Sequence, residues 1–370
     1  MTASTGTASS PEQDELLRLD GVVKRFPIQS HALLRRTREH VHAVDGLSLQ
    51  IRRGETLGLV GETGCGKSTL ARCVSRLYDV DAGTIIFAGR DISRLTRRQL
   101  RPVRRQIQMI FQDPYGSLNP RRRVGSIIAD PLRIHHVGDR NKRKNLVQET
   151  MELVGLNPEH YNRFPAEFSG GQRQRIGVAR ALIIRPELII CDEPVSALDV
   201  SIQAQILNLL ADLQDELALT YLFIAHDLSV VRHISDRVAV MYLGAIVEIG
   251  ATEQIFTHPR HPYTAALLSA AQEPDPDLVH HKARIILPGD PPSPINLPTG
   301  CRFHPRCPKA LPDCTVQSPE LTQRLHDPEE HQAACLFPVH DEEDLARAAT
   351  RADPQPDPAR PPVTSAEATQ

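Results

Sequence analysis

The sequence predicts an α/β fold in which helices cover both faces of a parallel sheet. Short apolar segments at 55–60, 188–191 and 221–225 have the length of buried strands, and helical patterns lie between them. The first of these segments runs directly into a Gly-rich loop and a helix. Pro, His and Cys become frequent after about residue 257, which predicts a small C-terminal module beside the α/β core.

The Gly-rich loop has the spacing G-x-x-x-x-G-K-[ST] of a phosphate-binding loop. It comprises Gly61, Glu62, Thr63, Gly64, Cys65, Gly66, Lys67, Ser68 and Thr69. Glycines let successive N–H groups face one anion, and the N-terminus of the following helix adds partial positive charge. We expect Lys67 to reach the β- and γ-phosphates of a bound nucleotide and Ser68 to ligate Mg²⁺. The alternative is a plain Gly-rich turn with an exposed lysine.

The other elements follow from hydrophobic periodicity. Alternation predicts strands at 17–23 and 47–51, and apolar residues at helical spacing predict a helix at 202–217. A further helix is expected at 172–184. Two apolar segments on either side of Gly244 predict a β-hairpin.

These patterns divide the chain into regions. We expect a disordered polar leader at 1–14, a nucleotide-binding domain at 15–257 and a C-terminal module at 258–340. Arg- and Gln-rich residues at about 98–165 predict a helical subdomain inserted into the nucleotide-binding domain. The Asp-, Glu-, Ala- and Pro-rich residues 341–370 predict a disordered tail.

Composition excludes several classes of function. The chain has 370 residues and a net charge of -2, which gives no basic excess for nucleic acid as the main partner. The sequence has no run of about 18 apolar residues, so it predicts no membrane span. The N-terminus lacks the apolar segment of a secretory signal. We therefore expect a cytoplasmic protein, or one attached to a membrane through another protein.

Two carboxylates follow the apolar strand at 188–191. In a fold with a phosphate-binding loop, the end of such a strand is where Mg²⁺ and the attacking water lie. We expect Asp192 to hold Mg²⁺ and Glu193 to polarise the water. The alternative is that both acids cap a turn that Pro194 begins.

A second anion-binding motif lies upstream of these acids. Ser169, Gly170, Gly171 and Gln172 precede a helix, as small residues do at an anion-binding helix N-terminus. Together with the phosphate-binding loop, this motif resembles only the ATP-binding cassette (ABC) ATPases, and the resemblance covers about residues 15–257. Phe168 departs from the family pattern, in which Leu is usual. The resemblance implies the ABC type of P-loop NTPase fold with an inserted helical subdomain.

The resemblance also implies roles for further residues. Phe26 matches the aromatic residue that stacks on adenine, Gln112 the glutamine that touches Mg²⁺ and signals to the helical subdomain, and His226 the switch histidine at the γ-phosphate. Residues 196–199 match the loop that crosses the dimer interface. A core role for Phe26 and a structural role for His226 are the alternatives. In this family two domains face head to tail, and each ATP lies between one phosphate-binding loop and the partner's Ser-Gly-Gly-Gln.

Three segments resemble the ATPases of oligopeptide and dipeptide importers, at 112–121, 261–268 and 300–308. Residues 54–62 and Cys65 are more similar to the F-type subunit of such importers than to its D-type companion. The resemblance implies an ATPase that powers peptide import at the cytoplasmic face of the inner membrane. Its partners would be a D-type ATPase subunit, two transmembrane permease subunits and, indirectly, a substrate-binding protein.

Other assignments compete with this one. Related importers carry nickel or glutathione. Non-transport ABC ATPases act in DNA repair or translation, but those proteins usually have tandem cassettes or long insertions. This chain has one cassette and no heptad run.

Four cysteines cluster in the C-terminal module: Cys301, Cys307, Cys314 and Cys335. So small a Pro-rich module needs a cross-link to fold, and disulfides are disfavoured in the cytoplasm. The spacing C-x5-C-x6-C-x20-C lacks the close pair of zinc modules and fails to match common ferredoxin patterns, so spacing leaves zinc, iron and buried thiols open. Members of the similar importer ATPases hold a [4Fe–4S] cluster on four cysteines here. The resemblance therefore implies such a cluster, with zinc as the alternative, in a structural role remote in sequence from the ATP motifs.

Overall fold

A computed structural model of the chain describes residues 14–28, 39–113, 116–270, 284–323, 327–328, 330–341, 343 and 345–346. All but the last residue of the expected leader, and nearly all of the expected tail, lie outside the described residues.

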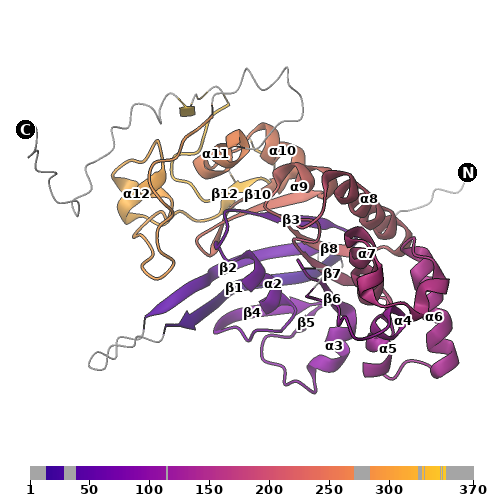
Figure 1. Cartoon of the computed structure of the whole chain (residues 1–370). Helices are drawn as coiled ribbons and strands as arrows, with labels where there is room; N and C mark the ends of the chain where they lie inside the picture. The colour runs from indigo at the N-terminus through magenta and orange to yellow at the C-terminus, as the bar shows by residue number, and fades with distance from the viewer. Residues whose placement is uncertain are drawn as a thin grey trace, which may run out of the picture.

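Two sheets form the centre of the molecule (Figure 1). The larger sheet has the strand order β11-β12-β10-β9-β3-β8-β7-β6, and its five strands from β9 to β6 are parallel. Its bounds are β3 (Thr56–Val60), β6 (Ile107–Ile110), β7 (Leu188–Asp192), β8 (Thr220–Ile224), β9 (Arg237–Tyr242), β10 (Ala245–Ala251), β11 (Thr322–Gln323) and β12 (Gln332–Ala333). Every residue of β3, β7 and β8 is buried, which explains their continuous apolar sequences. The parallel sheet and the hairpin at Gly244 are thus confirmed.

The smaller sheet is antiparallel, with the order β2-β1-β4-β5. Its strands are β1 (Glu15–Pro27), β2 (His40–Arg52), β4 (Ala82–Phe87) and β5 (Arg90–Asp91). Helix α2 (Lys67–Val74) contacts β2 of this sheet and β7 and β8 of the larger one. Its buried residues Leu70, Ala71 and Val74 therefore fasten the phosphate-binding loop between the two sheets.

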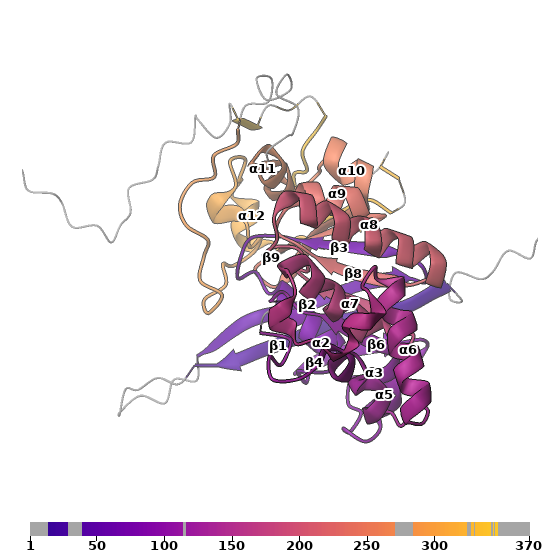
Figure 2. The ribbon, with the colours of Figure 1, turned by 45° about the vertical axis from the view of Figure 1, so that its right-hand side comes forward.

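Helices cover the face of the larger sheet that is turned away from α2 and the smaller sheet (Figure 2). They are α7 (Gly170–Leu182), α8 (Val200–Leu217), α9 (Leu228–Ile234) and α10 (Thr252–Thr257). Helix α8 buries Ile206, Leu210 and Leu213 on one face, as its hydrophobic periodicity predicts. It ends where Ala218 takes a left-handed conformation with φ of 50°.

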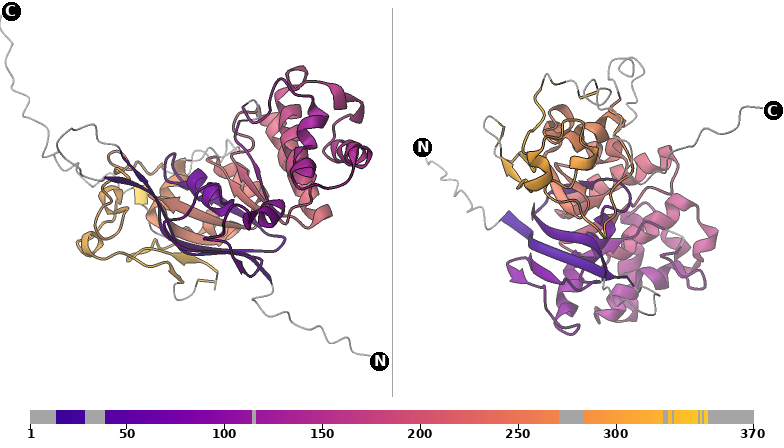
Figure 3. Two further views of the ribbon diagram at one scale, coloured as in Figure 1. Left: turned by 90° about the horizontal axis from the view of Figure 1, so that it is seen from below. Right: turned by 90° about the vertical axis from the view of Figure 1, so that its left-hand side faces the viewer.

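A helical arm projects at the end of the molecule opposite the C-terminal residues (Figure 3). It contains α4 (Val124–Ile128), α5 (Asp130–Ile134), α6 (Arg140–Leu153), η1 (Pro158–Asn162) and η2 (Pro165–Glu167). The expected helical range of 98–165 begins too early, because α3 (Leu100–Gln106) leads into β6, which pairs with β7 in the larger sheet. The buried residues Ile107 and Ile110 place that segment in the core instead.

The C-terminal residues pack as a continuation of the core. Their elements are α11 (Pro262–Ala270), η3 (His304–Arg306), α12 (Asp313–Val316) and the strands β11 and β12, of which β12 pairs with β10. Cys301, Phe303 and Cys314 belong to the same buried cluster as Tyr242 and Tyr263. The composition shift near residue 257 is therefore no break in the packing.

Candidate functional site

The phosphate-binding loop connects β3 to α2, in the context that its sequence predicts. Two glycines are required by close backbone approach as well as by conformation. Gly61 and Gly66 have φ of 152° and 111°, and a Cβ atom on them would lie 2.1 Å from the Met241 carbonyl oxygen and 1.9 Å from that of Ala43. The loop can take this shape only with glycine at both positions.

Lys67 and Ser68 begin α2 and contact different partners. The buried Lys67 Nζ donates hydrogen bonds to the carbonyl oxygens of Gly61 at 2.6 Å and Glu62 at 3.1 Å. The Ser68 hydroxyl donates to Asp192 Oδ1 at 2.9 Å. The predicted magnesium ligands Ser68 and Asp192, which are far apart in sequence, are thus in direct contact.

Asp192 is 3 % exposed at the end of β7. Burial raises the pKa of its carboxyl group, and the hydrogen bond from Ser68 offsets only part of that effect. An ionised carboxylate in this position is unfavourable without a compensating positive charge. The chemistry of the pair, a hydroxyl and a carboxylate oxygen, is that of a magnesium site.

Three other predicted residues meet at a single carboxylate. Glu193 Oε2 accepts a hydrogen bond from Gln112 Nε2 at 2.7 Å, and His226 Nδ1 lies 3.5 Å away from the same oxygen. Glu193 has a left-handed backbone with φ of 48°, which is uncommon outside glycine, and its N–H donates to the Ile224 carbonyl oxygen at 3.0 Å. This turn aims the acid at the residues that follow β6 and β8.

Ser169 and Gln172 form a capping box at the start of α7. The Ser169 hydroxyl accepts from the Gln172 N–H at 3.4 Å, and Gln172 Oε1 accepts from the Ser169 N–H at 3.0 Å. Both residues are exposed, while Gly171 packs against Ile202 of α8. The motif is therefore a pre-formed helix N-terminus with its polar side chains at the surface.

Residues 196–199 form a bend between Glu193 and α8. The Ser196 hydroxyl donates to the Glu193 carbonyl oxygen at 3.1 Å, and Gln203 holds the bend through the carbonyl oxygens of Val195 and Leu198 at 3.0 Å each. Val200, the next residue, is 80 % exposed. The expected position of this bend at a dimer interface stays a prediction.

Phe26 lies near the end of β1, half-buried, with its ring edge-on to Tyr78 at 5.5 Å between centroids. Lys24 Nζ lies 5.4 Å from the centre of the same ring. No hydrogen bond or ring contact in the described residues joins Phe26 to the phosphate-binding loop, so its expected contact with adenine stays a prediction.

The four clustered cysteines line one small cavity, of about 10 Å³, together with His304. All four are free thiols. Burial raises the pKa of Cys307 to about 12 and that of Cys335 to about 11, so as placed these groups are neutral thiols. Within the described residues no three His, Cys, Asp or Glu side chains are already arranged to hold a metal ion.

Thiol groups are the ligand type that iron–sulfur clusters and zinc use, and all four cysteines line this cavity. The cavity has the volume of about one water molecule, so the side chains would have to move apart to accommodate a cluster.

The structure shows two contacts with Glu62 that sequence reasoning missed. Arg306, between two of the cysteines, lies against Glu62 in the phosphate-binding loop, and Tyr263 contacts the same residue. The Cys-rich residues are remote from the ATP motifs in sequence, as noted above, but Arg306 in the same segment contacts the phosphate-binding loop in space. The only sequence signal was that both Arg306 and Tyr263 occur in the importer-like segments.

Among the helices of the described residues, none combines the length and apolar character that a membrane crossing needs.

Two family models match the chain. Residues 44–196 match the ABC transporter family, and residues 247–314 match the family described as oligopeptide/dipeptide transporter, C-terminal region. A solved ATP-binding cassette, a dimer in a post-hydrolysis state with ADP and Pi, is 26% identical with a TM-score of 0.57. The match covers 64% of this chain and 99% of that one.

Curated relatives are similar over nearly their whole length. The oligopeptide transport ATP-binding protein AppF of Bacillus subtilis is 52% identical, over 88% of this chain and 98% of that protein. OppF of Escherichia coli, with the same description, is 54% identical over 80% of this chain and 87% of that protein. The dipeptide transport ATP-binding protein DppF of Haemophilus influenzae is 49% identical over 84% of this chain and 94% of that protein.

The buried carboxyl of Asp192 generates a stability prediction. Because folding raises its pKa, ionisation costs more in the folded chain than in the unfolded chain. This cost to the free energy of unfolding is full at a pH above the raised pKa of the folded chain. It decreases as the pH falls through that pKa, and it is absent below the ordinary carboxyl pKa. We expect Asp192→Asn, which retains an acceptor for Ser68, to stabilise the nucleotide-free protein at pH 8 by about 1 kcal/mol.

Urea unfolding at pH 8 and at progressively lower pH checks this, with the exposed Asp199→Asn as the matched control. The gain should shrink toward about pH 4, where the wild-type carboxyl is also protonated. A variant no more stable than the control at pH 8 would contradict the assignment of burial as the dominant effect.

Proposed function

The chain belongs to the ABC transporter ATP-binding proteins of the oligopeptide and dipeptide branch, and from this premise we propose that it hydrolyses ATP to power peptide import across a membrane. The observation that carries the proposal is the convergence of two pairs at one edge of the sheet. Ser68 contacts Asp192, and Gln112 contacts Glu193. The relatives that are 49–54% identical are peptide transport proteins by name, which supports a peptide as the cargo.

In this proposal the loop binds the triphosphate. Its N–H groups and the start of α2 face the phosphates, and Lys67 exchanges its carbonyl partners for the β- and γ-phosphate oxygens. Ser68 and Asp192, with Gln112, would hold Mg²⁺, which when bound neutralises phosphate charge. Phe26 would stack on adenine.

Glu193 is the proposed general base. It takes a proton from the water that attacks the γ-phosphorus, and the products are ADP and phosphate. Gln112 and His226 orient its carboxylate, since both approach the same oxygen. The His226 side chain is 57 % exposed, and in this proposal it also contacts the γ-phosphate.

The second half of each ATP site comes from another chain in this proposal. Ser169 and Gln172 are exposed and already arranged as a helix cap, and Val200 presents an apolar side chain at the surface. We propose a head-to-tail pair with a D-type ATPase subunit, with a pair of identical chains as the alternative. The pair would attach peripherally to two transmembrane permease subunits at the cytoplasmic face of the membrane, and a separate binding protein would select the cargo.

We also propose that Cys301, Cys307, Cys314 and Cys335 hold a [4Fe–4S] cluster, with zinc as the alternative. Their convergence on one cavity supports a shared ligand. Such a group would cross-link residues that have little regular secondary structure.

Glu193→Gln tests the assignment of the base. The amide keeps the shape but cannot accept the proton, so turnover in the assembled transporter should fall about 100-fold or more while ATP binding persists. The measurement is phosphate release beside equilibrium ATP binding, with the exposed Glu216→Gln on α8 as control. Turnover within a few-fold of wild type would remove Glu193 from this role.

Ser169→Ala tests the composite site. In the assembled transporter, turnover should fall about tenfold, since the hydroxyl acts on the ATP held by the partner's loop. The affinity of the isolated mutant chain for ATP should stay as in wild type, because its own loop is unchanged. Full, unstimulated activity in isolated monomer would contradict the composite site, and Ser318→Ala serves as the surface control.

Metal analysis tests the cysteine site. Anaerobically purified protein should absorb broadly near ~400 nm and contain roughly four irons and four sulfides per chain, without stoichiometric zinc. Cys307→Ser should lose the absorbance, and Cys73→Ser, a buried cysteine of α2, should retain it. A colourless preparation with one zinc per chain would decide for zinc, and absence of both metals would exclude a metal site.

A further inference from the structure

We propose that Arg306 and Tyr263 are positioning residues that hold the phosphate-binding loop through Glu62, so that the C-terminal residues help this chain to bind its own nucleotide. This inference rests on the proposed function and adds a regulator of the same site. It concerns contacts within one chain.

Both ends of Glu62 are held by residues outside the loop. Arg306 Nη1 lies 3.0 Å from Oε1 and 2.9 Å from Oε2 of the Glu62 carboxylate. The Glu62 N–H donates to the Tyr263 hydroxyl oxygen at 2.8 Å. The side chain of Arg306 is 9 % exposed and that of Glu62 is 26 % exposed, so the ion pair is partly shielded from water. Glu62 is therefore fixed in both backbone and side chain.

The ion pair matters because Glu62 is the acid of the loop that receives a polyanion. Its carbonyl oxygen accepts from Lys67 Nζ at 3.1 Å, so its backbone adjoins the lysine expected on the phosphates. Without Arg306 the Glu62 carboxylate would be an uncompensated negative charge beside a triphosphate. The repulsion energy between two like charges is several-fold larger in a site shielded from water than in water itself. Arg306 supplies the positive charge that compensates this carboxylate.

An aromatic cluster makes the two positioning residues rigid. The rings of Tyr242, Tyr263 and Phe303 have centroid separations of 4.6, 5.3 and 5.4 Å, and all three are at most 1 % exposed. Tyr242 ends β9, Tyr263 is in α11, and Phe303 precedes η3, which ends at Arg306. These packed rings hold the backbone that carries Arg306 and Tyr263 beside the loop.

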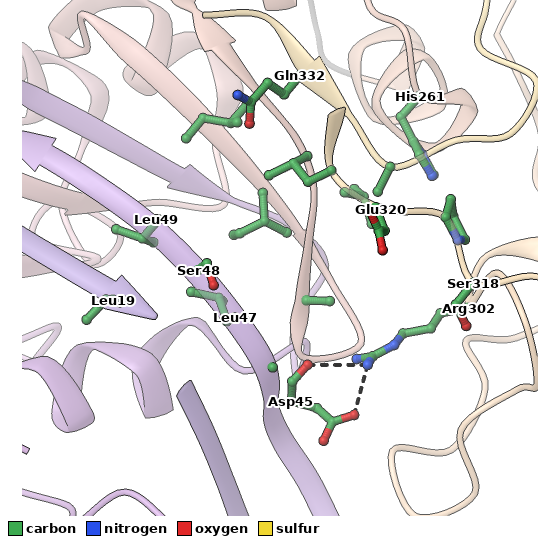
Figure 4. Close-up of a pocket in the computed structure, with 18 of the residues that line it drawn as sticks. Leu19, Asp45, Leu47, Ser48, Leu49, His261, Arg302, Ser318, Glu320 and Gln332 are labelled. Carbon is green, nitrogen blue, oxygen red and sulfur yellow. Dashed lines mark hydrogen bonds and ion pairs between the residues drawn. The ribbon is translucent and has the colours of Figure 1, made fainter. Parts of the chain in front are cut away.

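A second connection to the loop starts at Arg302, which Figure 4 shows beside Asp45. Arg302 donates to the Leu243 carbonyl oxygen at 2.6 Å and to Asp45 Oδ2 at 2.8 Å. It thereby fixes the turn at Gly244, whose N–H donates to the Cys65 carbonyl oxygen at 2.9 Å. The C-terminal segment thus supports the loop at two points, Glu62 and Cys65.

Equilibrium binding of a fluorescent ATP analogue to the full chain, with Mg²⁺, tests the inference. We expect Arg306→Gln to weaken binding about tenfold and Arg306→Lys to weaken it less, because the lysine restores the charge. The double variant Glu62→Gln/Arg306→Gln should bind more tightly than Arg306→Gln, since no carboxylate is left uncompensated. The exposed Arg284→Gln, in the same C-terminal region, is the matched control.

Tyr263→Phe provides an independent variant, because it keeps the packed ring and removes only the hydroxyl. It should weaken binding about threefold. In the assembled transporter Arg306→Gln should raise the KM for ATP with kcat within twofold of wild type, since Arg306 does not touch the reacting atoms. Metal content measured on each variant separates this effect from loss of a ligand at the neighbouring Cys307.

Two results would overturn the inference: Arg306→Gln and Tyr263→Phe binding within the error of wild type, or a double variant no better than Arg306→Gln. Failure of the wild-type chain to bind the analogue would instead overturn the proposed function.

Discussion

The site depends on the parallel pairing of β3, β8 and β7. In the register of these strands Leu59 lies opposite Ile224, and Ile224 lies opposite Asp192, so the three strands end at one level. The carboxyl end of each strand therefore delivers its next residues to the same edge of the sheet. The phosphate-binding loop, the two acids and His226 meet there because this register aligns them.

The edge is assembled at some cost to stability, as at many functional sites. Asp192 is a buried carboxylate, and Glu193 takes a backbone conformation that is rare for residues with a side chain. Neighbouring groups hold both in place: Ser68 donates to the first, and the Glu193 N–H bonds to β8. These features suit a site that binds a cation and a polyphosphate. Bound positive charge would offset the cost of burying the Asp192 carboxylate, and phosphate contacts would offset the cost of the Glu193 backbone conformation.

The C-terminal residues complete this arrangement from the side. Their strand β12 extends the larger sheet, their aromatic residue Phe303 joins the main core, and two arginines reach the loop region. A segment with so little regular structure gains its order from contacts with the α/β core. The same contacts make the loop's conformation depend on the segment, which is the basis for treating the two parts of the chain as one working unit.

The sequence by itself determined the parallel sheet, the hairpin at Gly244 and the loop between β3 and α2, because buried strands and phosphate-binding loops demand local residue patterns. It also placed Ser68 and Asp192 in one expected site, through the loop motif and the position of the acids after a buried strand. Only the tertiary structure decided that β6 belongs to the sheet, since the four residues Ile107–Ile110 have no distinctive periodicity. It alone decided that Arg306 pairs with Glu62, because a contact between residues 244 positions apart depends on how the chain packs. Patterns along the chain encode elements and motifs, whereas partners across the fold are chosen by packing.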